Sequence, residues 1–243
     1  EFIQDPSSFQ VDGQLSQPLV IRKLFERLGA TYIKLGQFIA SSPTLFPADY
    51  VREFQACLDK GPTVPFKDIE STIEADLGKP LSQLFAFVDE KPLASASVAQ
   101  VHRARLFNGA EVVIKVRKPG AEDSLTADLG FLAITSKLLE FVNPSLKQFS
   151  FSAIVGDIRS SMLDELDFTL EVDNLRQFRT FLDQAGITDA TAPEPYPELS
   201  GKRVLTMEYL EGVPLVDLEG ISKYSANPEE TLVAALRTWA LSV

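Results

Sequence analysis

The sequence predicts an α+β protein in which a small antiparallel sheet is set between helical segments. Residues 18–58 carry apolar side chains about one helical turn apart, and this spacing returns at 121–143 and 150–185. Between residues 84 and 117, short apolar runs bounded by turn residues indicate strands instead. The order of these segments predicts helices first, then the sheet, then helices again.

A hairpin signal supports the predicted sheet. Asn108 and Gly109 separate two β-rich runs, and both residue types adopt positive φ angles at little cost. Strands are therefore predicted over 98–106 and 110–117, after a loop of small residues at 94–97. Further along, RVLTMEYLEGVPL indicates a buried strand, and a last helix is predicted near the C-terminus.

Composition excludes several classes of function. The 243 residues carry a formal net charge of −11, which argues against a nucleic-acid partner because phosphate contacts need clustered cations. His102 is the only histidine and Cys57 the only cysteine, so no disulfide can form within the chain. A zinc site of His and Cys ligands is not expected either, and we interpret both residues as packed side chains.

Neither a membrane span nor a signal peptide is recognisable. No apolar run reaches the roughly 20 residues that a transmembrane helix requires, and the first residues, EFIQDPSSF, are polar and acidic. The chain begins without a methionine and ends within a helical pattern, so we expect it to be part of a longer protein.

Lys115 closes the apolar run VVIK, directly after the predicted hairpin. Such a lysine can protect an edge strand against aggregation. Alternatively, it can hold the phosphates of a nucleotide, as the lysine on the third strand of a kinase-like N-lobe does. The second interpretation requires three companions: a loop over the phosphates, a glutamate on a following helix, and a hinge strand.

Candidates for all three companions are present. The loop would consist of small residues whose backbone N–H groups can approach phosphate oxygens: Ala94, Ser95, Ala96 and Ser97. The glutamate would lie in MLDELDFTLEVDNLRQF. In the hinge strand, Met207 would face the nucleotide pocket, and backbone groups of Glu208 and Leu210 would reach an adenine. Taken singly, these segments also fit a strand entry, a solvated acidic helix and a buried strand.

The stretch TYIKLGQFIASS, residues 31–42, is unusual for a core helix because Lys34, Gly36 and Gln37 interrupt an apolar run. Lys34 and Gln37 are three residues apart and project from one face of a helix. The segment is either an awkward part of the core or a helix placed over a functional site, where Gly36 would permit close backbone approach.

Together these motifs resemble the UbiB/ADCK atypical kinase-like family. The resemblance rests on YIKLGQ (its Lys-x-Gly-Gln motif), ASASVAQVH (its alanine-rich loop), VVIKVRKPG, DELDFTLEVDN (its Glu-x-Asp motif) and VLTMEYLEGVPL. It implies a protein-kinase-like N-lobe with an N-terminal helical extension. The implied parts are the extension at 1–83, the nucleotide-binding N-lobe at 84–212, and the start of a C-lobe at 213–243.

By this resemblance, Lys115 holds the nucleotide phosphates and Glu171 is its ion-pair partner. A regulatory lid over the cleft would consist of Lys34 and Gln37 and of the acidic pair that meets them, Glu165 and Asp167. On one continuous helix, Glu165 and Glu171 would lie roughly 120° apart and could serve different lysines. Asp167 and Glu171, four residues apart, would share a face.

The sequence departs from the family in two ways. Ser95 stands where the loop usually has alanine and Ala99 where it has glycine, but neither change removes a backbone donor. More importantly, the His-x-Asp and Asp-Phe-Gly motifs, which serve catalysis and Mg²⁺ binding, do not occur. The residues after Gly212 are too few for a C-lobe, so we expect the Mg²⁺ ligands outside this chain.

The expected function is that of an atypical kinase or ATPase that binds ATP or ADP and acts in lipid or prenylquinone metabolism at a membrane. The alternative is a nucleotide-regulated pseudokinase scaffold or assembly factor that transfers no phosphate. Because the motifs resemble plastid and cyanobacterial members most, a chloroplast location is expected, with a mitochondrion or a bacterial cytoplasm as alternatives.

Overall fold

The computed structural model describes residues 10–11, 14–57, 61–142, 151–213, 217–225 and 227–242. It confirms the α+β class, with a small sheet and surrounding helices. The chain divides into two compact units. The first consists of Glu1–Ile69, Pro92–Gln100 and Arg117–Leu166, and the second of Glu70–Lys91, Val101–Val116 and Asp167–Val243.

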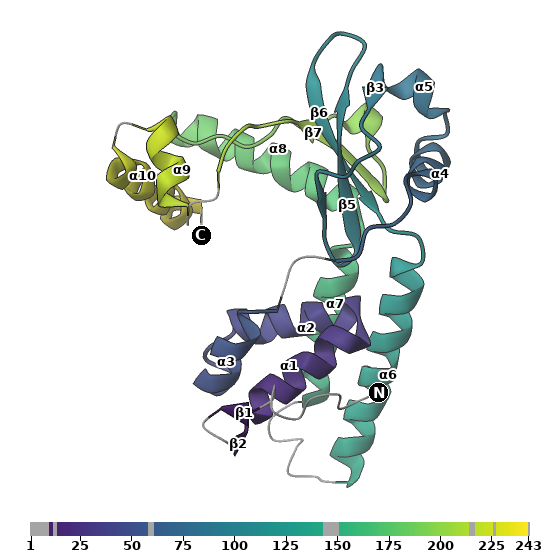
Figure 1. Ribbon diagram of the computed structural model, residues 1–243, viewed down its shortest axis with the longest axis vertical. Coiled ribbons are helices and arrows are strands. Elements are labelled where there is room, and N and C mark those ends of the chain that lie inside the picture. The colour runs from purple at the N-terminus through teal and green to yellow at the C-terminus, as the bar shows by residue number, and fades with distance from the viewer. Residues whose placement is uncertain are drawn as a thin grey trace. The chain divides into compact units, whose positions relative to one another are not determined.

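Helices dominate the first unit (Figure 1). They are α1 (Gln17–Leu28), α2 (Ala30–Ser41), α3 (Ala48–Phe54), α6 (Ala121–Val142) and α7 (Phe151–Asp164), with the two-residue strands β1 (Gln10–Val11), β2 (Gln14–Leu15) and β4 (Ala94–Ser95). Gly29 separates α1 from α2 with a φ of 105°, which glycine adopts far more readily than other residues. Helices α6 and α7 pack along each other.

The core of the first unit joins segments that are distant in the sequence. Leu125 and Leu129 of α6 are buried with Met162 of α7, with Leu166, which follows α7, and with Val98. Full burial of a side chain of this size contributes about 1.5–3 kcal/mol. The cluster therefore ties the two long helices to the residue that directly follows the predicted loop.

Helix α2 meets α3 through a glycine. Gly36 is buried, and a Cβ atom built on it would lie 2.7 Å from Phe54 Cδ1 and 2.8 Å from Cys57 Sγ. Cys57 is buried, as predicted, and the ring of Phe25 packs edge-on against that of Phe54. The close approach that Gly36 permits is thus made to α3 and to the cysteine after it.

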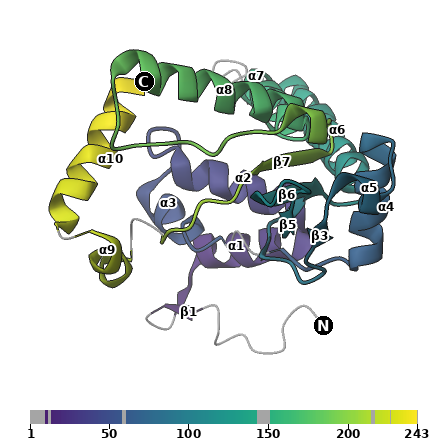
Figure 2. The same ribbon diagram turned by 90° about the horizontal axis from the view of Figure 1, so that it is seen from above.

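The second unit contains most of the sheet and the remaining helices (Figures 1 and 2). Its strands are β3 (Phe87–Val88), β5 (Ala99–Arg105), β6 (Glu111–Arg117) and β7 (Val204–Glu208), in the order β3-β5-β6-β7, with β4 beside β5. The helices are α4 (Phe66–Leu77), α5 (Leu81–Leu84), α8 (Phe168–Ala185), α9 (Leu218–Tyr224) and α10 (Pro228–Ser242), with a 3₁₀ turn at Pro197–Leu199. Helix α8 packs beside β7.

Strand β6 lies inside the sheet. It runs antiparallel to β7, with Lys115 opposite Leu205, and β5 flanks its other side. Its apolar residues Val112, Val113, Ile114 and Val116 are buried. The interpretation of Lys115 as the guard of an edge strand is therefore wrong, because β6 has a neighbour on each side.

The predicted hairpin between β5 and β6 is present, with a loop one residue longer than the shortest form. Gly109 has a φ of 91°, and its N–H donates to the carbonyl of Leu106 at 2.9 Å. The Leu106 N–H in turn donates to Ala110 at 2.9 Å. Three residues thus cross the turn, with glycine in the left-handed position that such loops require.

The continuous helix predicted over 150–185 is wrong, because the chain breaks between α7 and α8. Leu166 is buried, and its carbonyl accepts a hydrogen bond from Arg117 at 2.8 Å. Asp167 then caps α8, its carboxylate accepting the N–H of Thr169 at 3.1 Å. The expected 120° separation of Glu165 and Glu171 on one helix, and the shared face of Asp167 and Glu171, therefore do not apply.

The remaining elements follow the sequence with one exception. Helix α4 ends at Leu77, and the following Gly78 has a φ of 69°, the left-handed conformation typical of a helix C-cap; α10 begins at Pro228. The short helix α9 was not predicted. Among the described residues, no helix combines the length and the apolar character needed to cross a membrane.

Replacing Gly36 by alanine should destabilise the first unit. Alanine favours a helix interior, but its Cβ would collide with Phe54 and Cys57, and such overpacking costs about 1–3 kcal/mol. Urea unfolding of the variant measures the loss. Gly130→Ala is the matched control, because open space surrounds Gly130 in the interior of α6. That variant should keep or raise stability; equal effects of the two substitutions would contradict the packing described for Gly36.

Asp167→Ala should lower the free energy of unfolding by about 1 kcal/mol, since it removes the side-chain cap of α8. Asp167→Asn should stay near wild type because the amide oxygen can still accept the Thr169 N–H. Asp164→Ala, at the opposite end of a helix, should be neutral or slightly stabilising. Chemical denaturation compares all three, and a neutral Asp167→Ala would show that the cap is dispensable.

Candidate functional site

Lys115 and Glu171, paired by the family resemblance, are in contact in the second unit. The Nζ atom of Lys115 donates to the two carboxylate oxygens of Glu171 at 2.9 Å and 2.6 Å. It also lies 4.8 Å from the ring centroid of Phe168, within the range of a cation–π interaction. Because the side chains are 28% and 38% exposed, the ammonium can still be reached by a ligand.

Local structure explains why this pair forms. Pairing with β7 fixes the position of Lys115 along β6, opposite Leu205. Glu171 lies in the first turn of α8, where the helix dipole favours an acidic side chain. The start of that helix is fixed by the Asp167 cap and by the N–H of Phe168, which donates to the backbone carbonyl of Lys202 at 3.1 Å.

The predicted phosphate loop belongs to the first unit. Ala94 and Ser95 form the strand β4, which pairs with β5. The N–H of Ala96 donates to the carbonyl of Ala99 at 2.8 Å and so closes a tight turn. Ser97 follows within this turn and is half-buried. The loop is therefore folded back on itself by backbone hydrogen bonds, despite having no glycine.

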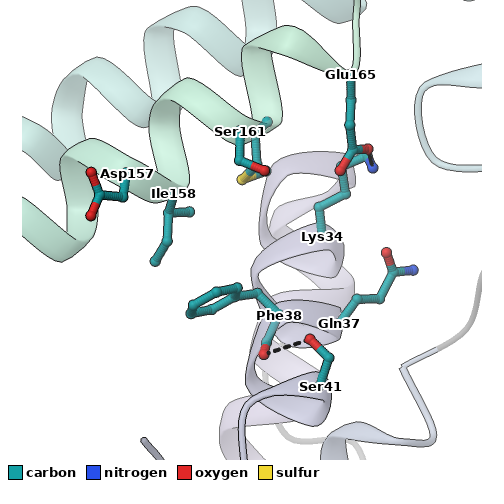
Figure 3. A pocket seen from close by; sticks show the side chains of 9 residues that line it. Lys34, Gln37, Phe38, Ser41, Asp157, Ile158, Ser161 and Glu165 are labelled. Carbon is teal, nitrogen blue, oxygen red and sulfur yellow. Dashed lines mark hydrogen bonds and ion pairs between the residues drawn. The ribbon is translucent and has the colours of Figure 1, made fainter. Parts of the chain in front are cut away.

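Lys34 and Glu165, two of the predicted lid residues, form an ion pair in the first unit. They stand at one end of a cleft of about 350 Å³ between α2 and α7 (Figure 3). Its lining is Lys34, Gln37, Phe38, Ser41, Asp157, Ile158, Ser161, Met162 and Glu165. The Lys34 side chain is 14% exposed and that of Glu165 52% exposed, so the carboxylate is the solvent-facing partner.

The other two lid residues differ in their positions. Gln37 lines the same cleft as Lys34, which agrees with the predicted common helix face. Asp167, however, belongs to the second unit, where its carboxylate accepts hydrogen bonds from Thr169 and caps α8. Of the acidic pair, Glu165 meets the lysine, whereas Asp167 organises the helix that carries Glu171.

The hinge candidates lie at the end of β7 and just beyond it. Met207 and Glu208 are the last two residues of the strand, and the exposed Leu210 follows. The N–H of Glu208 donates to the carbonyl of Glu194 at 2.8 Å. The N–H of Glu208 is therefore engaged within the protein.

Sequence reasoning missed two residues of interest, Phe168 and Lys118. Phe168 supports Lys115 with its ring, yet in DELDF it looks like any core aromatic residue. Lys118 is buried, whereas nothing in VRKPG distinguishes it from an ordinary surface lysine. His102 is buried as predicted, and its Nδ1–H donates to the carbonyl of Asp89 at 2.7 Å.

The site fits the phosphate part of a nucleotide better than it fits a metal ion. An ammonium has three donors, and the two that Glu171 engages leave one for a phosphate oxygen. No cluster of three or more His, Cys, Asp or Glu side chains that could hold a metal ion is found among the described residues.

Comparisons with known proteins place these features in a family. The chain is 53% identical over 236 residues to a chloroplastic aarF domain-containing protein kinase of Arabidopsis thaliana, covering 96% of this chain and 43% of the relative. It is 35% identical over 226 residues to the probable protein kinase UbiB of Marinobacter nauticus, covering 93% and 41%. The chain thus spans less than half the length of these relatives.

Structural similarity points the same way. A Mycobacterium tuberculosis protein, solved in complex with erythromycin, matches with a TM-score of 0.51 and 26% identity over 81% of this chain and 48% of that one. Residues 56–241 match the ABC1 atypical kinase-like domain. The resemblance to the UbiB/ADCK kinases is therefore confirmed, and the chain belongs to the ABC1 atypical kinase-like family.

Proposed function

We propose that this chain is the nucleotide-binding part of an atypical kinase or ATPase in which Lys115 contacts the phosphates of ATP or ADP. The observation that carries the proposal is the bidentate contact between Lys115 and Glu171, which holds an accessible ammonium in place. Membership of the ABC1 family supports it, because kinase-like domains use this type of lysine–glutamate pair.

The chemistry assigned to the pair is electrostatic. Lys115 would neutralise charge on the α- and β-phosphates, while Glu171 and the Phe168 ring hold the ammonium in one orientation. The loop 94–97 would cover the phosphates with its N–H groups other than that of Ala96, which donates to Ala99, and Met207, Glu208 and Leu210 would contact the base. Positioning and charge stabilisation are most of what a protein contributes to phosphoryl transfer.

Lys34, Gln37 and Glu165 would act as a lid that regulates access to this site. An ion pair with a half-exposed carboxylate contributes only about 0–1 kcal/mol, so it can open and close at little cost. Asp167 would contribute indirectly, through the start of α8. The cleft beside the ion pair gives the lid residues room to change their contacts.

The proposed setting is the chloroplast, in lipid or prenylquinone metabolism at a membrane. The chloroplastic relative from Arabidopsis thaliana supports the compartment, whereas the metabolic class rests on the motifs that resemble the UbiB/ADCK family. The structural relative was solved in complex with erythromycin, which is consistent with binding of a small molecule. Nucleotide binding without phosphate transfer would identify the protein as a scaffold instead.

ATP with Mg²⁺ should raise the melting temperature of the full-length protein by several degrees at saturating concentration. Lys115→Ala should abolish this shift because it removes the phosphate-binding cation. Differential scanning fluorimetry measures both, with Lys79→Ala, an exposed lysine of the same unit, as the control that keeps the shift. A wild-type protein that shows no shift with ATP or ADP would rule out the proposed nucleotide site.

Lys34→Ala should change nucleotide affinity or hydrolysis several-fold while lowering the free energy of unfolding by less than about 1 kcal/mol. Isothermal titration and ATPase assays give the first quantity and urea unfolding the second. Lys23→Ala is the control, because it also removes an ion pair of the first unit but lies on α1. If Lys34→Ala destabilises the fold and leaves nucleotide handling unchanged, α2 is a core helix and not a lid.

A further inference from the structure

Lys118 is a buried lysine whose charge is satisfied entirely by backbone carbonyl groups in the described contacts. Its side chain follows directly on strand β6, and the residue is 7% exposed. The ammonium donates to the carbonyl of Pro62 at 2.8 Å and to the carbonyl of Ala96. Burial lowers the pKa of Lys118, and the two carbonyl oxygens take the place of water around the charge.

These two carbonyls belong to different segments of the first unit. Pro62 lies in the segment 61–64, hereafter the strap, which has no regular secondary structure, and Ala96 lies in the loop 94–97. The strap and the loop also bond directly: the Gly61 N–H donates to Ser95 O at 2.9 Å, and the Ser95 hydroxyl donates to Pro62 O at 3.1 Å. Lys118 therefore bridges two segments that already touch.

The far end of the strap is fixed as well. The buried side chain of Gln100 accepts the Val64 N–H at 3.0 Å and donates to the Val64 carbonyl at 3.3 Å. Both hydrogen-bonding groups of Val64 are thus engaged by one amide, as in a strand ladder. The strap is consequently held at both ends, and the loop beside it cannot shift without breaking these hydrogen bonds.

Gly61 lets the strap lie directly against the loop. A Cβ atom on this residue would overlap the carbonyl oxygen of Ala96 and lie 2.9 Å from Lys118 Nζ. Any larger side chain would push the loop away or displace the lysine. The contact thus requires glycine at position 61 and the long cationic side chain of Lys118.

We propose that Lys118 is a positioning residue that clamps the loop 94–97 onto the strap and thereby sets the affinity of the site for the phosphates of a nucleotide. This rests on the proposed function, in which the loop covers those phosphates. Glycine-rich phosphate loops are ordered largely by their ligand, so they lose conformational entropy on binding. A loop that is clamped beforehand binds without that loss.

If Lys118 clamps the loop, the hydrogen bonds between the strap and the loop should open together when the ammonium is removed. Without the ammonium, the carbonyls of Pro62 and Ala96 lose a buried donor, so the strap and the loop should separate more often. The amides of Gly61 and Ala96, which donate to Ser95 and Ala99, report that opening. A lysine that only supported the core would not change these two amides selectively.

The experiment compares wild-type full-length protein with Lys118→Met, which keeps the length of the side chain but removes its donors. Lys137→Met is the matched control, because Lys137 is an exposed lysine on α6 of the same unit. Amide hydrogen exchange is followed without nucleotide, the Kd for ADP and for ATP with Mg²⁺ is measured by titration, and the melting temperature is recorded. Ser95→Ala, which removes only the hydroxyl bond to Pro62, provides a milder second variant.

Lys118→Met should speed exchange at Gly61 and Ala96 at least tenfold and raise the nucleotide Kd about tenfold, while Lys137→Met matches wild type. Ser95→Ala should shift the same amides in the same direction by a smaller factor, and it decides the matter if Lys118→Met does not fold. Unchanged exchange at these amides would overturn the clamp. Faster exchange with an unchanged Kd would overturn its effect on affinity.

The two proposals fail in distinguishable ways. A wild-type protein that binds neither ADP nor ATP refutes the nucleotide site, and with it the claim about affinity. The exchange of Gly61 and Ala96 is measured without nucleotide, so it still decides whether Lys118 orders the loop. Binding in wild type, together with wild-type exchange and Kd in Lys118→Met, refutes the clamp and leaves the nucleotide site standing.

Discussion

One constraint shapes much of the structure: cationic side chains cluster at the C-terminal end of the buried strand β6, and each of them needs a polar partner. The strand is apolar because β5 and β7 flank it, and its register is fixed by pairing with β7. Lys115 and Arg117 lie in the last three positions of the strand, and Lys118 follows it directly. A charge beside a buried strand costs free energy unless a partner satisfies it, so these cations dictate where other segments must come.

The three cations bind different kinds of partner. Lys115 meets the carboxylate of Glu171 in the second unit. Arg117, counted in the first unit, donates to the carbonyl of Leu166 and pairs with Glu122. Lys118 is held by carbonyl groups of the strap and the loop. Among the described residues, no buried side-chain nitrogen or oxygen lacks a partner, so the polar contacts are mutually satisfied rather than merely tolerated.

What could be predicted followed from local signals and from the family motifs. Asn108 and Gly109 predicted the hairpin, the 3.6-residue spacing predicted most helices, and the resemblance paired Lys115 with Glu171. The break at Leu166 could not be predicted, since no glycine or proline marks it. There, burial of an apolar side chain and a hydrogen bond from a residue 49 positions earlier end the helix. Local propensity gives way where tertiary contacts are stronger.

The strap could not be predicted from the sequence either, because it also depends on tertiary contacts. Its bonds are formed by the backbone of residues 61–64, and backbone groups carry no identity in a sequence. The role of Lys118 likewise depends on where it is buried. For the segment around Gly36, the sequence allowed both a core helix and a helix over a functional site. Only the distances to Phe54 and Cys57 show which neighbours the glycine approaches.

Two of the contacts that hold helix α2 respond oppositely to dissolved salt. Toward Glu165 it is held by an ion pair with a solvent-facing carboxylate, which mobile ions screen within about 8 Å at physiological ionic strength. Toward α3 it is held by the dry contact of Gly36 with Phe54 and Cys57, which excluded salts such as sulfate strengthen. Added salt therefore weakens the contact of α2 with Glu165 while it leaves the contact with α3 intact.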